Sequence, residues 1–316
     1  MASSAFAQVE MDLIRPFEAL DFSLYMNTPD TGRVMIVPKG QALDPDLRLK
    51  LSRKNADLYI LDQDKEKYRL HLEEGLRRLI RAERIDETKA ASLAYGLSLQ
   101  AIEAVFENPD PKTIEQANGS FAATAELIIT KERALFALLE LTRSSRRLHI
   151  HSCNVAIFGL GLARNLISEG LEINIHRLSS ALFFHDLGEI SLDPDLIGKT
   201  SDLTPEEFQK IREHPAIGRE LLSEAGFLTE EADAVIYQHH ERLDGSGYPE
   251  GLRGDEIKLP ARICAIADIY DSLSSDSISY QGENGHSAAF HMIREMSAQL
   301  DVDLLRRFIE MFRRAD

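Results

Sequence analysis

Residues 183–190 read FFHDLGEI, with His185 and Asp186 side by side directly behind two phenylalanines. The apolar residues on both sides predict a buried helical segment. An imidazole or a carboxylate buried without a partner is costly, so the pair requires something to bind to. The stretch therefore raises the question of what these two polar side chains share inside an apolar core.

The chain around this stretch reads as a series of amphipathic helices. In one of them Thr204 is placed as N-cap, Pro205 as the first helical residue and Glu207 as the closing residue of a capping box. The proline after His214 disfavours the α conformation, which places this histidine at a bend between two helices. This half of the chain is predicted to be a helical bundle.

A pair of histidines, His239 and His240, precedes the glycine-rich loop DGSGYPEGLRG (244–254). Adjacent residues of a helix project about 100° apart. We therefore expect both rings to reach one site only if the helix ends at the pair, and the glycines of the loop predict such an end.

The N-terminal part has a different pattern. Three β-type runs are predicted as strands and one segment as a short helix: LDFSLYM (20–26), RVMIV (33–37) and ADLYILD (56–62) for the strands, and DPDLRLKLSRKN (44–55) for the helix. The prolines of NPDP (108–111) interrupt the following helices. We expect a small N-terminal α+β domain with a regulatory role at 1–110 and a helical metal-binding domain at 111–316.

The charge of the chain restricts its partners. The 316 residues include 36 Lys+Arg and 52 Asp+Glu, a formal net charge of -16. Such a surface repels duplex DNA and anionic lipid, so neither nucleic acid nor membrane is an expected partner. Cys153 and Cys264 lie in apolar helical stretches and are predicted to be buried thiols in a reducing compartment. The acidic residues near the N-terminus and the short apolar run VAIFGLGLA (155–163) favour a cytoplasmic protein.

Seven histidine and aspartate residues of the helical half form the candidate metal site. They are His151, His185, Asp186, His214, His239, His240 and Asp268. A lone buried histidine is usually structural, but seven such side chains would each need a separate partner, whereas shared cations satisfy them together. Imidazole and carboxylate suit iron, manganese or zinc, and seven ligands are too many for one ion. A carboxylate can bridge two ions about 3.5–4 Å apart, and Asp186 is the natural candidate.

Five segments together resemble the HD-GYP family, the bacterial cyclic di-GMP phosphodiesterases of the HD superfamily. They are HSCNVA (151–156), HDLGE (185–189), LTPEEFQKIREHPAIGRELL (203–222), HHERLDGSGYPEGL (239–252) and ARICAIADIYDSL (261–273). The resemblance covers about residues 140–275 and implies a mainly α, HD-superfamily helical bundle. The N-terminal part is similar to a small α/β domain often found ahead of such modules.

The resemblance also implies roles for the residues that match its motifs. His151, His185 and Asp268 would hold one divalent ion, and the histidines at 214, 239 and 240 the other, with Asp186 as the bridge. Iron is the favoured metal and manganese the next. The implied reaction is attack on a phosphorus of cyclic di-GMP, or of a related cyclic dinucleotide, by a hydroxide that bridges the two ions, giving the linear dinucleotide or GMP. Asp186 and Glu189 are then the candidate catalytic residues, and Arg242 and Tyr248 the candidate substrate contacts.

The sequence departs from the family pattern at two places. Glu189 stands where the family usually has lysine, and Ser277, Ile278, Ser279 and Tyr280 replace a DRPYR-like run. Glu189 would repel a phosphodiester, point away from the site, pair with an arginine or add a metal ligand. The alternative function is therefore a catalytically impaired module that binds metal and nucleotide and signals through a protein partner. A third interpretation is a phosphohydrolase that acts on another nucleotide. The helices at 115–148 also predict a homodimer.

Overall fold

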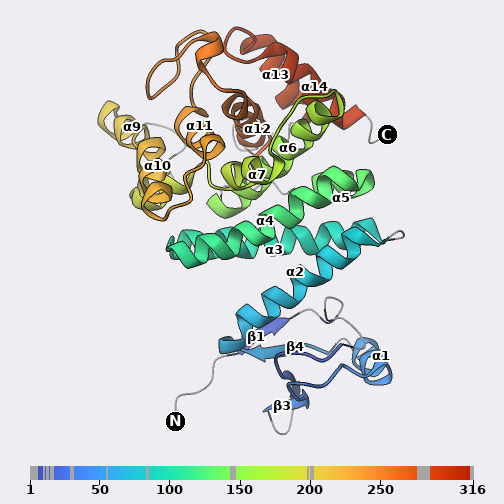
Figure 1. The fold of residues 1–316 in the computed structure, drawn as a ribbon. Helices are drawn as coiled ribbons and strands as arrows, with labels where there is room; N and C mark the ends of the chain where they lie inside the picture. The colour runs from blue at the N-terminus through green and yellow to red at the C-terminus, as the bar shows by residue number, and fades with distance from the viewer. Residues whose placement is uncertain are drawn as a thin grey trace. The chain divides into compact units, whose positions relative to one another are not determined.

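The structure, a computed structural model, describes most of the chain. The described residues are 6–9, 11, 14, 18–28, 32–54, 56–82, 85–142, 147–197, 199, 203–275 and 285–313. They divide into two compact units, Met1–Ile85 and Asp86–Asp316, which can be followed by colour from the N-terminus to the C-terminus in Figure 1.

The first unit is a small α+β structure. Its elements are β1 (Phe6–Val9), β2 (Leu24–Thr28), β3 (Gly32–Val37), α1 (Pro45–Arg53), β4 (Leu58–Leu61), the 3-10 helix η2 (Asp62–Asp64) and α2 (Lys65–Arg81). The four strands form one antiparallel sheet in the order β1-β4-β2-β3. The three predicted strands and the predicted short helix are therefore confirmed, whereas the sequence analysis missed β1.

Alternation of buried and half-buried side chains explains how the sheet packs. In β4, Leu58 and Ile60 are buried while Tyr59 and Leu61 are partly exposed, as expected for side chains on opposite faces of a strand. Asp44 is the N-cap of helix α1. Its carboxylate accepts hydrogen bonds from two backbone amides of the first helical turn at 3.0 Å.

The second unit is helical. Its elements are α3 (Glu87–Glu107), α4 (Pro111–Thr130), α5 (Glu132–Leu141), α6 (Leu148–Ser168), α7 (Ile175–Phe183), η3 (Leu187–Ser191), α8 (Pro194–Ile197), α9 (Pro205–Ile211), α10 (His214–Glu224), α11 (Glu230–Gln238), η4 (Gly254–Glu256), α12 (Leu259–Ser275), α13 (Gly285–Glu295) and α14 (Val302–Arg313). The mainly α class with a small N-terminal α+β unit is as predicted.

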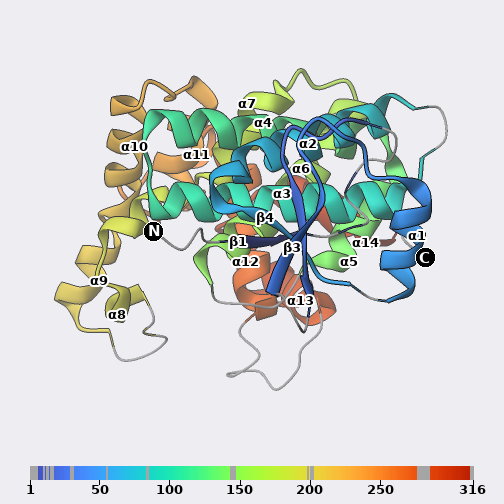
Figure 2. The ribbon, with the colours of Figure 1, turned by 90° about the horizontal axis from the view of Figure 1, so that it is seen from below.

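The boundary between the units differs from the predicted one. Helices α3 and α4 lie side by side (Figures 1 and 2), and α3 also packs against α5 and α6. The compact units consequently divide between Ile85 and Asp86, not near residue 110. The NPDP prolines do end α3 and start α4, but they mark a helix–helix turn inside the second unit.

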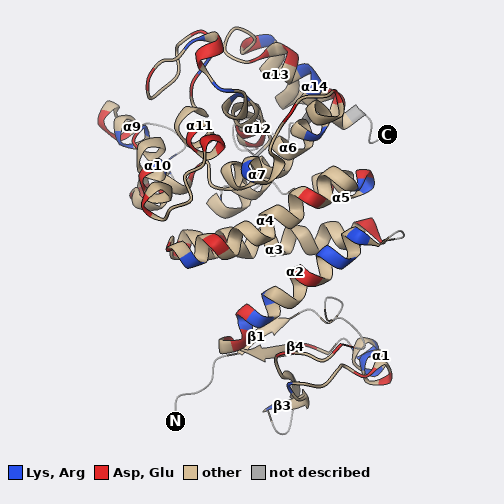
Figure 3. Cartoon of the chain, viewed as in Figure 1, with Lys and Arg blue, Asp and Glu red and all other residues tan. Residues whose placement is uncertain are grey.

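Helix α6 lies in the interior of this unit and packs against α7 and α12. It is long and apolar enough to span a membrane, but 72% of its 18-residue apolar segment is buried inside the protein. Cys153 of α6 and Cys264 of α12 are free and fully buried, as predicted. Acidic and basic residues are interspersed along the outer helices (Figure 3).

Candidate metal centre

The HD pair lies in a turn, which corrects the expectation of a continuous helix. Helix α7 ends at Phe183, and η3 begins at Leu187, so His185 and Asp186 lie between them. Phe183 anchors the turn because it is fully buried and stacks on Phe121 of α4 with ring centroids 3.9 Å apart. The turn lets two neighbouring polar side chains point into the same space.

A close contact between η3 and α10 fixes the turn on its other side. A Cβ atom added at Gly188 would lie 2.0 Å from the carbonyl oxygen of His214 and 2.6 Å from the amide nitrogen of Gly218. Only glycine allows the two backbones to approach so closely. This contact brings the start of α10, and with it His214, next to Asp186.

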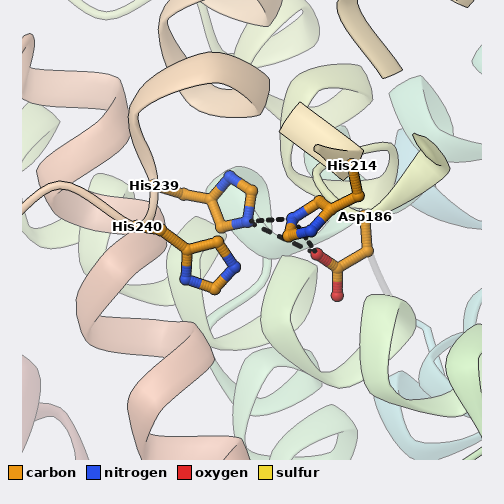
Figure 4. Close-up of side chains that lie close together, drawn as sticks. All are labelled: Asp186, His214, His239 and His240. Atoms are coloured by element: carbon orange, nitrogen blue, oxygen red, sulfur yellow. Dashed lines mark hydrogen bonds and ion pairs between the residues drawn. The ribbon is translucent and has the colours of Figure 1, made fainter. Parts of the chain in front are cut away.

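The two carboxylate oxygens of Asp186 face different histidines. Its Oδ1 lies 3.5 Å from Nε2 of His214 and 3.3 Å from Nε2 of His239, the arrangement shown in Figure 4. Its Oδ2 lies 3.0 Å from Nε2 of His185 and 3.4 Å from Nε2 of His151. Asp186 thus lies within 3.5 Å of a ring nitrogen of all four imidazoles.

Hydrogen bonds fix the protonated nitrogen of these rings. In His185, His214 and His239, Nδ1 lies between 2.8 and 3.0 Å from a backbone carbonyl oxygen three or four residues earlier. A carbonyl can only accept, so Nδ1 carries the proton and Nε2 of the neutral ring presents its lone pair. In His151, Nδ1 lies 2.7 Å from a carboxylate oxygen of Asp271, which can likewise only accept, so this Nδ1 also carries a proton.

These lone pairs converge in a way that requires a cation. Nε2 of His214 and Nε2 of His239 are 3.4 Å apart, so two lone pairs face each other. The buried Nε2 of His185 makes no hydrogen bond among the described residues, although Oδ2 of Asp186 is 3.0 Å away. Nitrogen lone pairs and carboxylate oxygens at these distances repel one another. A divalent metal ion bound between them relieves this repulsion. The residues present therefore fit metal ions.

The structure brings the seven candidate ligands together in two groups. Within each group the ligand atoms all lie within 4.8 Å of one another: Asp186, His214, His239 and His240 in one, and His151, His185 and Asp268 in the other. The six other ligands divide as the resemblance implied, with Asp186 in the His214 group, and each group could hold a metal ion.

Burial and neighbouring charges shift the histidine pKa values in opposite directions in the two groups. Burial would lower the pKa of His151, but its hydrogen bonds to Asp186 and Asp268 outweigh this effect and raise the pKa well above its usual range. Burial lowers the pKa of His214 to about 4, and it lowers that of His240 as well. The lowered pKa values favour neutral rings at His214 and His240, whereas the raised pKa favours a protonated ring at His151 in the metal-free protein.

The paired histidines reach one site as predicted, because α11 ends at Gln238. His239 and His240 follow the last helical residue, with ring centroids 4.1 Å apart. The ring of Tyr248 stacks on His240 at 4.6 Å, and the guanidinium of Arg212 lies over the same tyrosine at 4.8 Å. Tyr248 therefore lies at the edge of the metal centre.

Arg242 is placed less favourably for a substrate contact. Its Nη1 donates to the carbonyl oxygens of His239 and Glu241 at 3.1 and 2.9 Å. Glu241 in turn is buried and accepts hydrogen bonds from three consecutive backbone amides, those of residues 250–252. The visible role of both side chains is to order the loop that carries Tyr248.

Glu189 lies near the metal centre, close enough for the charges of Asp186 and Asp268 to act on its carboxyl group. Its pKa is raised to about 8, first by burial and then by the negative charge of Asp186, with a smaller contribution from Asp268. Among the described residues no basic side chain forms an ion pair with it. Ser277, Ile278, Ser279 and Tyr280, the second departure from the family pattern, lie outside the described residues.

Two residues behind the centre were missed in the sequence: Asp271, which contacts His151, and Asn154, which contacts Asp271. Asp271 accepts from His151 at 2.7 Å and from Nδ2 of Asn154 at 2.9 Å. Asp271 follows Asp268 by three places on α12, and Asn154 follows His151 by three places on α6, so each lies on the ligand-bearing side of its helix. This spacing was the available signal.

Comparison with known proteins agrees with this geometry. Residues 162–304 match the family described as HD domain. This part of the chain is thus similar to the HD domain family. The matched segment includes six of the seven candidate ligands, and His151 lies just before it.

Two proteins with similar sequences are named as cyclic dinucleotide phosphodiesterases. A cyclic di-GMP phosphodiesterase of Pseudomonas aeruginosa is 31% identical over 183 residues, which cover 58% of this chain and 44% of that protein. The 3′3′-cGAMP-specific phosphodiesterase 3 of Vibrio cholerae is 37% identical over 127 residues, or 40% of this chain and 27% of that protein. The chain thus spans less than half the length of either relative.

A solved structure shares the fold. Bd1817, a HDG"Y"P protein from Bdellovibrio bacteriovorus, superposes with a TM-score of 0.67 at 19% identity, covering 98% of this chain and 100% of that chain. Together with the HD domain match and the named relatives, it confirms the resemblance predicted from the five motifs.

Proposed function

We propose that the HD domain is a metal-dependent phosphodiesterase that hydrolyses cyclic di-GMP. In this proposal His151, His185 and Asp268 would hold one divalent ion, His214, His239 and His240 would hold the second, and Asp186 would be shared between them. The observation that carries it is the orientation of Asp186, whose Oδ1 faces one histidine group and whose Oδ2 faces the other. The named activities of the relatives support the substrate class.

The ligand set favours iron, with manganese as the next candidate, because mixed imidazole and carboxylate ligands suit both. When bound, the two ions supply Lewis acidity to a phosphate oxygen and lower the pKa of a water molecule enough to make it a nucleophile. The chain's own residues hold the geometry. Asp186 sets the spacing of the two groups, and the carbonyl-bonded Nδ1 atoms keep each Nε2 directed inward.

The substrate contacts are less well defined. Tyr248 stacks on His240 and stands at the edge of the centre, a position that supports contact with a nucleotide. Arg242 is a weaker candidate, because its Nη1 is engaged by two backbone carbonyls. The cytoplasmic location, the homodimer and the protein partner stay predictions from the sequence.

The experiment begins with metal-free protein reloaded anaerobically with Fe²⁺ or Mn²⁺. Metal content is measured first, and turnover of cyclic di-GMP is then followed by separating the cyclic, linear and mononucleotide species. 3′3′-cGAMP serves as the competing substrate. We expect hydrolysis by the wild type and none by Asp186→Asn, while Asp303→Asn, which removes an exposed carboxylate on α14, behaves as the wild type. Metal-loaded protein that turns over neither nucleotide would contradict the proposal.

A specific observation supports a second candidate function, the catalytically impaired module that binds metal and nucleotide. The partly buried carboxyl of Glu189 lies close enough to Asp186 and Asp268 for their charges to raise its pKa. An ionised carboxylate there opposes an anionic phosphodiester, whereas a lysine would attract it. Measurable nucleotide binding without turnover favours this module, and activity gained by Glu189→Lys assigns the defect to that one side chain.

A further inference from the structure

A buried hydrogen-bonded chain joins the two helices of the His151 metal group, α6 and α12, to helix α3. Nδ1 of His151 on α6 donates a hydrogen bond to Oδ2 of Asp271 on α12, with 2.7 Å between the two atoms. The other oxygen, Oδ1, accepts from Nδ2 of Asn154 at 2.9 Å, and Oδ1 of Asn154 lies 3.4 Å from the hydroxyl of Tyr95 on α3. The side chains of Asp271, Asn154 and Tyr95 are 2%, 0% and 6% exposed, so water does not compete for these bonds.

The directions of donation in this chain are fixed. The hydroxyl of Tyr95 donates to the amide oxygen of Asn154, which turns the amide nitrogen toward Asp271. The carboxylate of Asp271 can only accept, so it takes one hydrogen bond from Asn154 and one from Nδ1 of His151. His151 then keeps a proton on Nδ1, which leaves Nε2 as the atom to offer a metal ion. Nε2 lies 3.3 Å from Asp268 and 3.4 Å from Asp186.

His151 differs from the other ligand histidines in how its ring is oriented. The rings of His185, His214 and His239 are fixed by carbonyl oxygens of their own helical turn, three or four residues away. His151 instead depends on a residue 120 positions away in the chain. Its orientation therefore rests on the packing of α6 against α12, and a change in that packing acts on one metal group and not on the other.

We propose that Asp271, oriented by Asn154, is a positioning residue that fixes the His151 ring and thereby selectively controls metal affinity at the His151 group. The inference rests on the proposed metal sites, because it assigns a role toward the ion that His151, His185 and Asp268 would hold. Partners that orient metal-bound histidines in this way typically contribute about 10–100-fold to metal affinity.

The test measures Mn²⁺ binding to metal-free protein without nucleotide. His239→Ala disables the His214 group and leaves the His151 group, and His151→Ala does the reverse. In the His239→Ala background we expect Asp271→Asn to weaken Mn²⁺ binding by about 10–100-fold. In the His151→Ala background the same substitution should change binding by less than about twofold, the range for independent sites. Asp110→Asn is the matched control, since asparagine also caps α4 well.

A transposed pair separates positioning from general damage to the fold. In Asp271→Asn combined with Asn154→Asp, the new amide oxygen accepts from His151 and the new amide nitrogen donates to the carboxylate at 154. We expect this double variant to recover most of the affinity lost in Asp271→Asn. Equal weakening in both histidine backgrounds, or no recovery by the transposed pair, overturns the inference. Absence of Mn²⁺ binding by the wild type would instead overturn the proposed function.

Discussion

Substitution of Gly188 by alanine tests whether the contact between η3 and α10 sets the geometry of the metal centre. The added Cβ would lie 2.0 Å from the carbonyl oxygen of His214 and 2.6 Å from the amide nitrogen of Gly218. Both atoms belong to the backbone, so no side-chain rotation relieves the contact. The two segments have to separate, and they carry Asp186 and His214.

The size of the separation follows from the distances. Real Cβ atoms essentially never approach another heavy atom closer than 3.0 Å, so the carbonyl oxygen has to recede by at least 1 Å, the difference between 3.0 and 2.0 Å. Metal–ligand distances tolerate only about 0.2 Å. The His214 group should therefore lose most of its affinity, while the His151 group keeps its ligands. Overpacking of this kind costs about 1–3 kcal/mol, which for a unit of this size lowers Tm by on the order of 10 °C at the upper end.

The assay combines elemental analysis with thermal unfolding of the metal-free protein. We expect Gly188→Ala to retain about half the metal of the wild type and to unfold at lower temperature. Gly96→Ala is the matched control, because a Cβ at this position of α3 meets nothing within 4 Å. It should gain about 0.5–1 kcal/mol from improved helix propensity. A Gly188→Ala protein with wild-type metal content and wild-type Tm would refute the argument.

Three further outcomes are expected. In metal-free protein, Glu189 has a folded-state pKa of about 8, above its usual value, so folding retains a proton and stability falls as pH rises toward 8. The free energy of unfolding of Glu189→Gln should thus exceed that of the wild type by roughly 1–3 kcal/mol at pH 9 and equal it at pH 4. A difference that stays the same at both pH values would contradict this. Glu241→Gln places an amide against the backbone amides of residues 250–252 and should cost about 1–3 kcal/mol in urea unfolding, whereas Glu256→Gln, at the edge of η4, should cost less. Mn²⁺ at 100 times its Kd should raise the unfolding free energy by about 2.7 kcal/mol per site, and an unchanged Tm would exclude native-state binding.

Local chemistry explains which features the sequence could predict. The capping box of Thr204 and Glu207 and the helix end at Gln238 depend on residues within a few positions, and both are confirmed. The turn at His185 and Asp186 was not predictable in this way. It depends on the approach of Gly188 to α10, and apolar periodicity alone does not distinguish a helix from two short segments joined by a turn.

Long-range packing explains the remaining differences. The division of the chain at 85/86 depends on where α3 packs, whereas prolines mark only where helices end. Asp271 was missed because its partner lies 120 residues away, and only the packing of α6 against α12 brings the two together. Strand β1 was missed because it pairs with β4, more than 40 residues later in the chain.

The balance of charge at the centre gives Glu189 its significance. Asp186, Glu189, Asp268 and Asp271 carry four negative charges when ionised, and two divalent cations offset them, which leaves the centre neutral. With lysine in place of Glu189 the same centre would carry two positive charges, matching the two phosphates of a cyclic dinucleotide. Bound cations would become the largest local charges and would oppose the raised pKa that Glu189 has in the metal-free protein. Under the proposed function, Glu189 would weaken the attraction for an anionic nucleotide and leave the metal ligands in place, so we expect Glu189→Lys to strengthen nucleotide binding without changing metal content.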